Sequence, residues 1–323
     1  EFRRVLFRSN LRGEEMPINT KPKILENLNK ENKKVSFEPM KPKYSFEEVI
    51  LNEYEKERVL DSLCYNEHHE LVFNNWGLNN THKMSKKFGI NLYGPPGTGK
   101  TMIAHAIAKH LNRNLIQIDY SEIESKYVGE TSKNLVSAFA KAKETKSILL
   151  FDEADAILSR RVSSMTNATD VSVNQTRSVL LTLMNDYNDI ILFTTNYIEN
   201  FDPAFMRRIH SHINIGLPDE KSRKKLWKNY IPNNLPHNLN IEEISNKYSG
   251  ISGSDISNAV LLSAFRGARE KEKFVKHDYF EDSIKQIIES KNRNEKSNVK
   301  IEKREVSEEY AMKMMNKNKE EKL

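Results

Sequence analysis

Short apolar runs alternate with helical patterns through the middle of this 323-residue chain. The runs predicted as strands are 90–94, 115–119, 147–151, 190–196 and 212–217. Between them, apolar residues recur every three or four positions, as they do on one face of a helix. The helices predicted there are 100–111, 121–127, 131–144 and 176–187. Strands that alternate with helices form a parallel sheet covered on both faces, so the pattern predicts an α/β fold.

The pattern changes on both sides of this alternation. Upstream, Lys, Asn, Glu and Pro are frequent until Ser45, where a stripe of helical period begins in "SFEEVILNEYEKERVLDSL". Beyond Pro218 only helical patterns remain, which predicts a small all-helical domain. In one of its helices, an apolar face is expected from Ile256, Val260, Leu261 and Ala264.

These changes divide the chain into parts. Residues 1–9, "EFRRVLFRS", resemble the translation of a sequencing-library adapter, and we expect them to be an assembly artefact. The remaining parts are predicted as a flexible arm at 10–44, a large domain at 45–218, a small helical domain at 219–290 and a charged tail at 291–323.

Composition narrows the class of protein. With 37% hydrophobic and 30% charged residues, the chain has the character of a soluble protein with a sizeable core. No uninterrupted apolar run reaches about eighteen residues, so no transmembrane helix is predicted. Cys64 is the single cysteine, which excludes an internal disulfide and fits a reducing cytoplasm. The 51 basic residues are matched by 45 acidic ones, and this mixed charge gives little support to nucleic-acid binding.

The stretch "GPPGTGKT" predicts a phosphate-binding loop. It fits the pattern G-x-x-x-x-G-K-[ST] and lies between a predicted strand and a predicted helix, which is the context that this loop requires. Backbone N–H groups and the following helix N-terminus then surround the phosphates of ATP. Lys100 is expected at the β and γ phosphates, and the Thr101 hydroxyl at Mg²⁺. The residues expected to hold the nucleotide here are Gly94, Pro95, Pro96, Gly97, Thr98, Gly99, Lys100, Thr101 and Met102.

Polar residues that follow two later strands supply candidate catalytic groups. Asp152 ends the buried run "SILLFD" and is expected to hold Mg²⁺, largely through water, together with Thr101. Glu153 follows and is predicted to polarise the attacking water. Asn196 ends "FTTN", where its amide is expected to bind that water or the γ-phosphate; an ordinary turn residue is the alternative interpretation.

Together these segments resemble the AAA group of the AAA+ ATPases, over about Ser45 to Glu289. The resemblance rests on "GINLYGPPGTGKT", "SILLFDEADAI", "TTNYIENFDPAFMRRI" and "YSGISGSDI" in this order. It implies a P-loop NTPase fold, a parallel sheet sandwiched by helices, followed by a small all-helical lid domain. It also implies a homo-oligomeric ring, usually a hexamer, with ATP between subunits.

The same resemblance assigns further residues. The segment "FDPAFMRRIHSHINIGLPD" is similar in length to that of the katanin and spastin branch, which places Arg207 and Arg208 at the arginine-finger positions. In "SGSD", Gly253 and Ser254 match a turn near the adenine. "SFEEVIL" resembles the entry segment beside the adenine, although family members often carry glycine where this chain has isoleucine or leucine.

The segment "SKYVGET" indicates what the energy of ATP hydrolysis is used for. In the family this position is the first pore loop, and Lys126, Tyr127, Val128 and Gly129 resemble its aromatic, aliphatic and glycine pattern. An aromatic ring on such a loop grips an extended polypeptide without reading its sequence. The polar stretch 160–177 is predicted as a second loop facing the pore.

The sequence therefore predicts an ATP-driven motor that remodels or unfolds proteins, with its substrate or adaptor unidentified. A nucleic-acid remodelling ATPase and a slow-turnover regulatory ATPase are the alternatives. No H-E-x-x-H motif is present, which argues against a fused zinc protease. The adjacent pair His68 and His69 lacks metal-site spacing, and a solvated turn is the expectation there.

Overall fold

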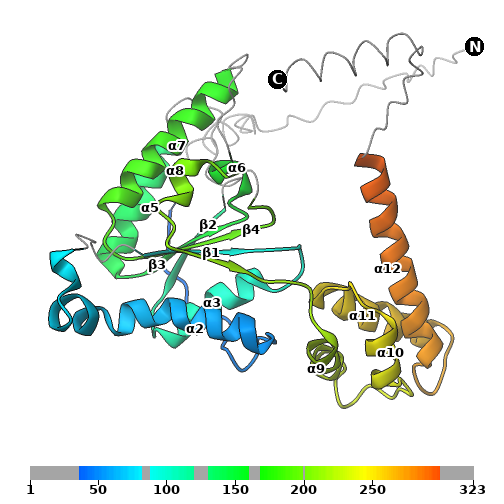
Figure 1. The fold of residues 1–323 in the computed structure, drawn as a ribbon. Helices are drawn as coiled ribbons and strands as arrows, with labels where there is room; N and C mark the ends of the chain where they lie inside the picture. Colours follow the sequence, from blue (N-terminus) through cyan, green and yellow to red (C-terminus); the bar gives the residue numbers. More distant parts are fainter. Residues whose placement is uncertain (1–35, 82–87, 120–129, 160–167, 199–200, 299–323) are drawn as a thin grey trace, which may run out of the picture. The chain divides into compact units, whose positions relative to one another are not determined.

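The computed structural model describes residues 36–81, 88–119, 130–159, 168–198 and 201–298 (Figure 1). The chain separates after Ser36 into two units, and the described helices and strands all belong to the second, Phe37–Leu323. The predicted first pore loop and the helix predicted at 121–127 lie outside the described residues. So does most of the predicted arm and tail.

A five-stranded parallel sheet forms the centre of the larger part of the structure. Its order is β2-β3-β4-β1-β5, and every pairing is parallel. The strands are β1 (Phe88–Tyr93), β2 (Leu115–Asp119), β3 (Ile148–Asp152), β4 (Ile190–Thr195) and β5 (Ser211–Asn214). The predicted α/β fold is confirmed.

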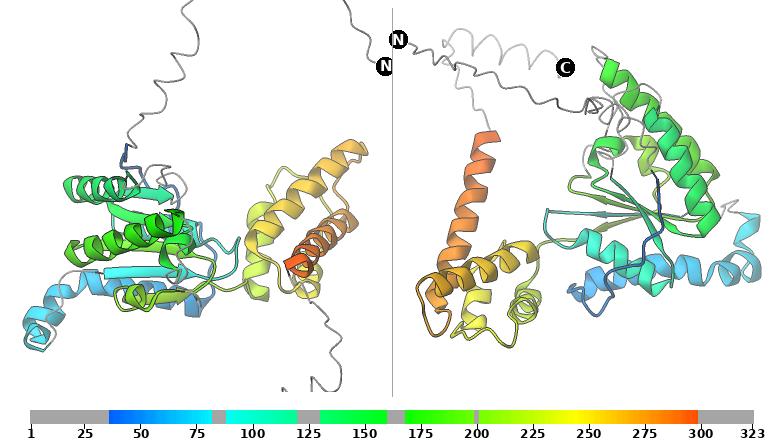
Figure 2. Two further views of the ribbon diagram at one scale, coloured as in Figure 1. Left: turned by 90° about the horizontal axis from the view of Figure 1, so that it is seen from above. Right: turned by 180° about the vertical axis from the view of Figure 1, so that it is seen from behind.

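Helices cover both faces of the sheet, which is why its central strands are buried along most of their length. Helix α3 (Lys100–His110) contacts β1, β3 and β4, whereas α5 (Glu130–Thr145) contacts β2 and β3. In Figure 1, α2 (Glu53–Glu67) lies with α3 beneath the sheet, and α5 lies above it with α7 (Ala168–Asp186). The other views show the same layers (Figure 2). Fully buried core side chains include Ile90, Leu92, Ile103, Ile107 and Leu192.

Short elements complete this part of the structure. A π-helical turn (Leu71–Asn75) and a 3-10 turn (Leu78–Asn80) follow α2. Helix α6 (Asp155–Leu158) follows β3, and α8 (Pro203–Met206) follows β4. Helix α7 begins at Ala168, so the second half of the stretch predicted as a loop at 160–177 is helical, contrary to the prediction.

Residues just before Ser45 also pack against the sheet, although the sequence placed them in the arm. Phe37 is buried, and Met40 forms an antiparallel bridge with Leu115 at the start of β2. Asn52 caps α2 in a capping box with Glu55. The apolar stripe predicted in this segment is only partly buried: Val59 and Leu63 are buried, whereas Leu60 is exposed.

Four helices form a region with its own core. They are α9 (Glu220–Tyr230), α10 (Ile241–Lys247), α11 (Gly253–Arg269) and α12 (His277–Asn298). Trp227 and Phe280 are fully buried at its centre, 6.0 Å apart between ring centroids. The predicted face of α11 needs one correction, because Leu261 is 56% exposed. The face that packs inward is instead Ile256, Ala259, Val260, Ser263 and Gly267, at the spacing of three and four residues that a helix requires.

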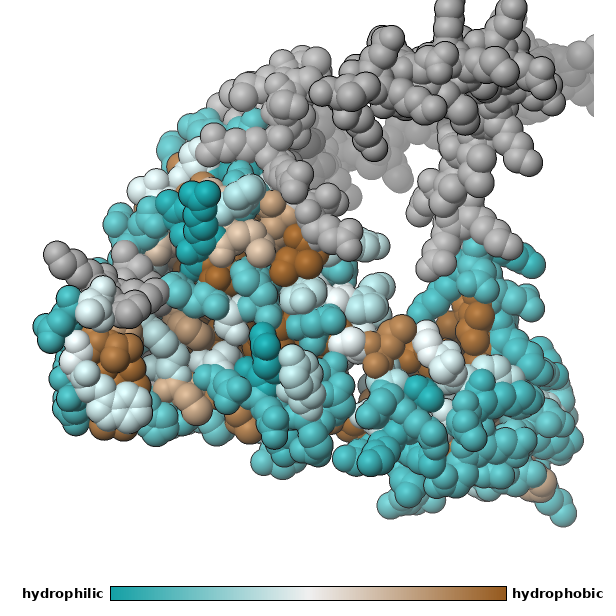
Figure 3. Space-filling model, in the orientation of Figure 1, coloured by the Kyte–Doolittle hydropathy of each residue, from teal (hydrophilic) through white to brown (hydrophobic). Residues whose placement is uncertain are grey.

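The surface view in Figure 3 is mostly hydrophilic, with small hydrophobic patches. Among the described helices, none combines the length and the apolar character needed to span a bilayer.

Candidate nucleotide-binding site

A cavity of about 460 Å³ lies at the carboxyl ends of the central strands. This volume is within the usual range for small-molecule sites, and the position is the one where parallel α/β sheets bind ligands. Its walls come from four parts of the chain: residues 48–55, the phosphate loop with the ends of β3 and β4, residues 215–230, and the first turns of α11.

Three glycines shape the phosphate loop. Gly94, Gly97 and Gly99 have φ values of 145°, 78° and 93°, which L-residues with a side chain rarely adopt. A Cβ atom on Gly94 would lie 2.1 Å from the carbonyl oxygen of Ile215, and one on Gly97 would lie 2.0 Å from Ser254 Oγ. At Gly94 the close atom is rigid backbone, which leaves no room for a side chain, whereas at Gly97 the close atom is a serine hydroxyl and the positive φ is what favours glycine.

Lys100 is buried at the centre of the loop. Its ammonium donates to the carbonyl oxygens of Gly94 and Pro95, at 2.8 and 2.9 Å, and to Asn196 Oδ1 at 3.0 Å. Burial lowers the pKa of Lys100, and the nearby carboxylates, Asp155 foremost, act in the opposite direction. The ammonium is thus held among neutral acceptors that an anionic phosphate is able to replace.

Asp152 is the centre of a hydrogen-bond network. Its carboxylate accepts from Thr101 Oγ1 at 2.9 Å, from Gln117 Nε2 at 3.0 Å and from Thr194 Oγ1. The paired hydroxyl and carboxylate oxygens of Thr101 and Asp152 are the hard ligands that Mg²⁺ prefers. These residues therefore fit a magnesium ion held at the phosphate loop.

Glu153 is exposed, and its backbone conformation is strained. Its φ is +50°, an unusual value for glutamate, and its N–H donates to Thr194 Oγ1 at 3.0 Å. Such conformations cost about 1–3 kcal/mol and persist where the surroundings fix them. Both Glu153 and Asp152 line the cavity, so the two carboxylates face the same space.

Asn196 lines the same cavity, at the end of β4. Its backbone N–H donates to the Asp155 carboxylate at 3.0 Å, and the N–H of Tyr197 does so at 3.1 Å. Asp155, Thr194 and Gln117 were not predicted from the sequence. Asp155 follows Glu153 by two positions and Thr194 precedes Asn196 by two, so a search of the turns around each predicted residue would have found both.

Arg207 and Arg208 lie away from this cavity. Neither is among the residues that line it. Arg208 Nε donates to Asn185 Oδ1 at 2.8 Å and an Nη atom donates to the Ala204 carbonyl oxygen at 2.8 Å. Arg207 is exposed, and it forms no side-chain hydrogen bond or ion pair within the part of the chain that the structure describes.

The helical region and the entry segment close two sides of the cavity. Gly253 and Ser254 line it, and Ser254 N–H donates to the Gly97 carbonyl oxygen at 3.2 Å. Ile50 and Leu51 line it too, as predicted for the entry segment. Met102 is also a lining residue, whereas Gly94 and Pro95 contribute only the carbonyl groups that hold Lys100. The sequence missed several apolar and polar wall residues of α9 and α11: Leu226, Asn229, Tyr230, Ser257 and Asn258.

Comparison with known proteins identifies this arrangement. The family model described as "ATPase family associated with various cellular activities (AAA)" matches residues 90–217. A model of parvovirus non-structural protein NS1 matches residues 40–114, which hold the phosphate loop but neither Asp152 nor Asn196.

Individual relatives agree with the AAA match. A proteasome-activating nucleotidase of Methanocaldococcus jannaschii is 35% identical over 211 residues, which are 63% of this chain and 49% of that protein. The 26S proteasome regulatory subunit 8 of Dictyostelium discoideum is 33% identical over 208 residues, 62% of this chain and 52% of that one. An ATP-dependent zinc metalloprotease FtsH of Ureaplasma parvum is 30% identical over 223 residues, 68% of this chain and 31% of that one.

The chain thus spans about half the length of the two proteasome-related proteins it matches, and less of the protease. These relatives are named as a proteasome-activating nucleotidase, a proteasome regulatory subunit and an ATP-dependent zinc metalloprotease. The chain therefore contains an AAA ATPase domain, homologous to proteasome-activating nucleotidases and to regulatory subunits of the 26S proteasome.

Proposed function

We propose that this protein binds ATP with Mg²⁺, hydrolyses it to ADP and phosphate, and uses the energy to remodel or unfold protein substrates. One observation carries the proposal: Lys100, Thr101, Asp152, Glu153 and Asn196 come from three separate segments and line one cavity. A phosphate loop alone would serve many reactions. A second carboxylate and a polar amide beside it favour attack by water.

The residues divide the work of hydrolysis. Lys100 exchanges its carbonyl partners for the β and γ phosphates, and the loop N–H groups bind the remaining oxygens. Thr101 and Asp152 would hold Mg²⁺, which would neutralise charge on the phosphates. Glu153 accepts a proton from the attacking water, and Asn196, already within 3.0 Å of Lys100, is positioned near the γ-phosphate.

The proposal includes a homo-oligomer, specifically a hexameric ring, in which Arg207 and Arg208 complete the site of the neighbouring subunit. A guanidinium supplied in trans stabilises charge on the transferred phosphoryl group. The position of both arginines outside their own cavity supports this role. The assignment to the katanin and spastin branch stays a prediction that rests on the length of the arginine-bearing segment.

Protein substrates are proposed on two grounds. The relatives include proteins named as proteasome-activating nucleotidases and 26S proteasome regulatory subunits. In addition, Tyr127 and Val128 of the predicted pore loop suit contact with an extended polypeptide. We also propose that 45–218 acts as the nucleotide-binding domain and 219–290 as its lid. A cytoplasmic location is proposed from the single cysteine alone.

The test is the ATPase rate of the chain as a function of protein concentration, alone, with an unfolded polypeptide, and with single-stranded DNA. We expect the rate per subunit to rise with concentration and to rise further with the polypeptide. Tyr127→Ala should remove the stimulation and spare the basal rate. Stimulation by DNA instead would favour the nucleic-acid alternative, and a slow rate that no polymer changes would favour the regulatory one.

A further inference from the structure

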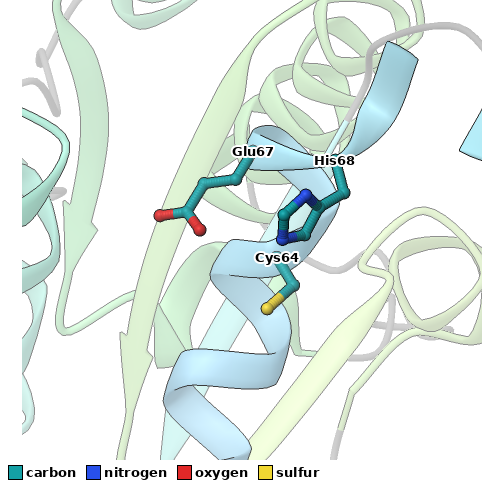
Figure 4. Close-up of side chains that lie close together, drawn as sticks. All are labelled: Cys64, Glu67 and His68. Carbon is teal, nitrogen blue, oxygen red and sulfur yellow. The ribbon is translucent and has the colours of Figure 1, made fainter. Parts of the chain in front are cut away.

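Three metal-binding side chains converge where helix α2 ends (Figure 4). Cys64 and Glu67 lie in the last turn of α2, and His68 is its C-cap residue. The Cys64 sulfur, a Glu67 carboxylate oxygen and a His68 imidazole nitrogen all lie within 4.8 Å of one another. Residues separated by three and four positions share one face of a helix, so this spacing aims the three side chains to the same side.

A fourth ligand lies beside them on another helix. His110 is the last residue of α3, and its Nε2 is 3.3 Å from Glu67 Oε1. The ring of His110 packs edge-on against Phe46, with centroids 5.6 Å apart. Once the His110 ring turns from Glu67 toward the other two side chains, one thiol, two imidazoles and one carboxylate are available to a single ion. Sulfur and nitrogen ligands in this number suit tetrahedral zinc.

The surroundings favour a cation. The C-terminal ends of α2 and α3 meet here, and the C-terminal end of a helix carries partial negative charge. The last turn of α2 contains no basic residue. Among the described residues, neither lysine nor arginine forms an ion pair with Glu67. At the end of α3 positive charge is supplied by Lys109, which pairs with Glu48 at 3.9 Å, whereas the end of α2 has no lysine or arginine of its own.

A second group of potential metal ligands already has lysine partners. Glu243, His277 and Glu281 also lie close together in the helical region. Glu281, however, already forms ion pairs with Lys247 and Lys285. These ammonium groups occupy the carboxylate and would repel an incoming metal ion, so this group carries no proposal.

We propose that Cys64, Glu67, His68 and His110 form a binding site for a divalent metal of the zinc class. Zinc–ligand bonds of about 2.0–2.3 Å place tetrahedral ligand atoms roughly 3.3–3.8 Å apart. The ligand atoms of Cys64, Glu67 and His68 lie within 4.8 Å of one another, so these exposed side chains need to rotate closer together, and His110 needs to turn toward them, to reach tetrahedral separations. The neighbouring His69 takes no part, because its ring is stacked on Phe73 with centroids 4.4 Å apart.

Such an ion would join two helices that both begin at the nucleotide cavity. Near its start α2 contributes Glu55 to the cavity wall, and α3 contributes Lys100 and Thr101. The proposed site lies at the other ends of the same helices. Metal binding therefore fastens the far ends of two elements whose near ends hold the nucleotide, and it raises the stability of the folded state by mass action.

The first experiment uses the single thiol as the probe. Because Cys64 is the only cysteine, the thiol reagent dithionitrobenzoate reports on this site alone. We expect stoichiometric Zn²⁺ to slow the reaction of the reduced full chain by at least about tenfold, since a metal-bound thiolate is withdrawn from exchange. Unchanged reactivity with Zn²⁺ in excess overturns the proposal.

Single substitutions test whether these four residues, rather than other surface groups, bind the metal. His68→Ala, Glu67→Gln and His110→Ala should each weaken protection by about tenfold or more, as loss of a metal partner usually does. Glu70→Gln, an exposed carboxylate next to the cluster, and His237→Ala, a histidine of the helical region, should leave it unchanged. If His110→Ala protects as well as the original chain, the proposed link between α2 and α3 is wrong.

Cobalt gives an independent signature. One Co²⁺ per chain should produce the thiolate-to-metal charge-transfer absorption and the strong visible bands of a tetrahedral site, and Zn²⁺ should displace both. Cys64→Ser should remove the charge-transfer band while its circular dichroism and ATP binding stay normal, because Cys64 is exposed and is not among the residues that line the cavity. Visible tetrahedral bands that persist in Cys64→Ser would place the metal elsewhere and overturn the assignment.

Discussion

The carboxylate of Asp155 accepts the backbone N–H of Asn196 at 3.0 Å, which ties the turn after β3 to the end of β4. The Asn196 side chain on the same residue meets Lys100. Asp155 is therefore a positioning residue. Asp155→Ala should lower kcat by about tenfold, because a charge-assisted hydrogen bond is lost, while KM changes little. Steady-state kinetics measure the two constants, and the exposed Asp278→Asn serves as the control. A change confined to KM would contradict this role.

Glu153→Gln tests the assignment of the general base. The variant should bind ATP with normal affinity and lose about 10² to 10⁴ in kcat, since glutamine does not accept a proton from water. Rapid-quench turnover and a fluorescent-nucleotide binding assay measure the two effects. Glu144→Gln, which changes an exposed carboxylate on α5, controls for the loss of charge. Normal turnover in Glu153→Gln would refute the assignment.

Mixing subunits tests whether arginine acts across an interface. Arg208 bonds to Asn185 and Ala204 of its own chain and does not line its own cavity. Arg208→Ala alone should lower kcat by about 10³. Titrated into the original protein, it should reduce activity more steeply than dilution does, whereas exposed Arg269→Ala should not. A linear loss would indicate that each subunit acts independently. The same titration with Arg207→Ala compares the two arginines.

Two glycines with unusual backbone angles should respond differently to alanine. At Gly94 an added Cβ would lie 2.1 Å from the rigid backbone oxygen of Ile215, in addition to the strain of its φ of 145°. At Gly250, φ is 79° and nothing lies within 4 Å of the added atom. We expect Gly94→Ala to cost more than about 2 kcal/mol of unfolding free energy and Gly250→Ala about 1 kcal/mol. Urea denaturation measures both, and equal costs would show that the contact with Ile215 is relieved.

Glu55 should make stability depend on pH. It is buried, and burial raises its pKa above its usual range, although hydrogen bonds from Gly216 and Asn52 oppose the change. Because the folded-state pKa is the higher one, the stability that Glu55 contributes is present at low pH and is lost as pH rises through that value. Relative to Glu55→Gln, the original chain should lose stability over the pH interval that begins near the usual pKa of glutamate, about 4.3, and extends upward from it. A constant difference in urea-unfolding free energy over that interval would contradict the direction of the shift.

Much of the fold was predictable because its signals are local. β2 was predicted at its observed bounds, and the ends of β1, β3 and β4 differ from the prediction by one or two residues. A continuous apolar run is visible in the sequence whatever surrounds it. β5 ends at Asn214, earlier than predicted, because the apolar residues that follow leave the sheet: Ile215 is buried beside the Gly94 turn.

The phosphate loop and the acidic end of β3 were also predictable from the sequence, but the contacts that hold them in place were not. Thr194 orients Asp152 and the backbone of Glu153 only because β3 and β4 are neighbours in the sheet. The contact of Ser254 with Gly97 joins residues far apart in the chain. The grouping of Cys64 with Glu67 and His68 was not predicted, because it joins residues three and four positions apart on α2 and not the adjacent pair His68 and His69.

The segment that connects β5 to α9 beside the cavity has a mechanical consequence. β5 is an edge strand that pairs with β1, and the chain leaves it through Ile215 and Gly216 toward α9. Ile215 N–H donates to Tyr93 at 2.7 Å and Gly216 N–H donates to Glu55 at 2.8 Å, which extends the ladder past the strand end. A pull on the helical region along β5 would load all these bonds together in shear, rather than one after another. The connection from β5 to the helical region therefore transmits tension without β5 peeling away from β1.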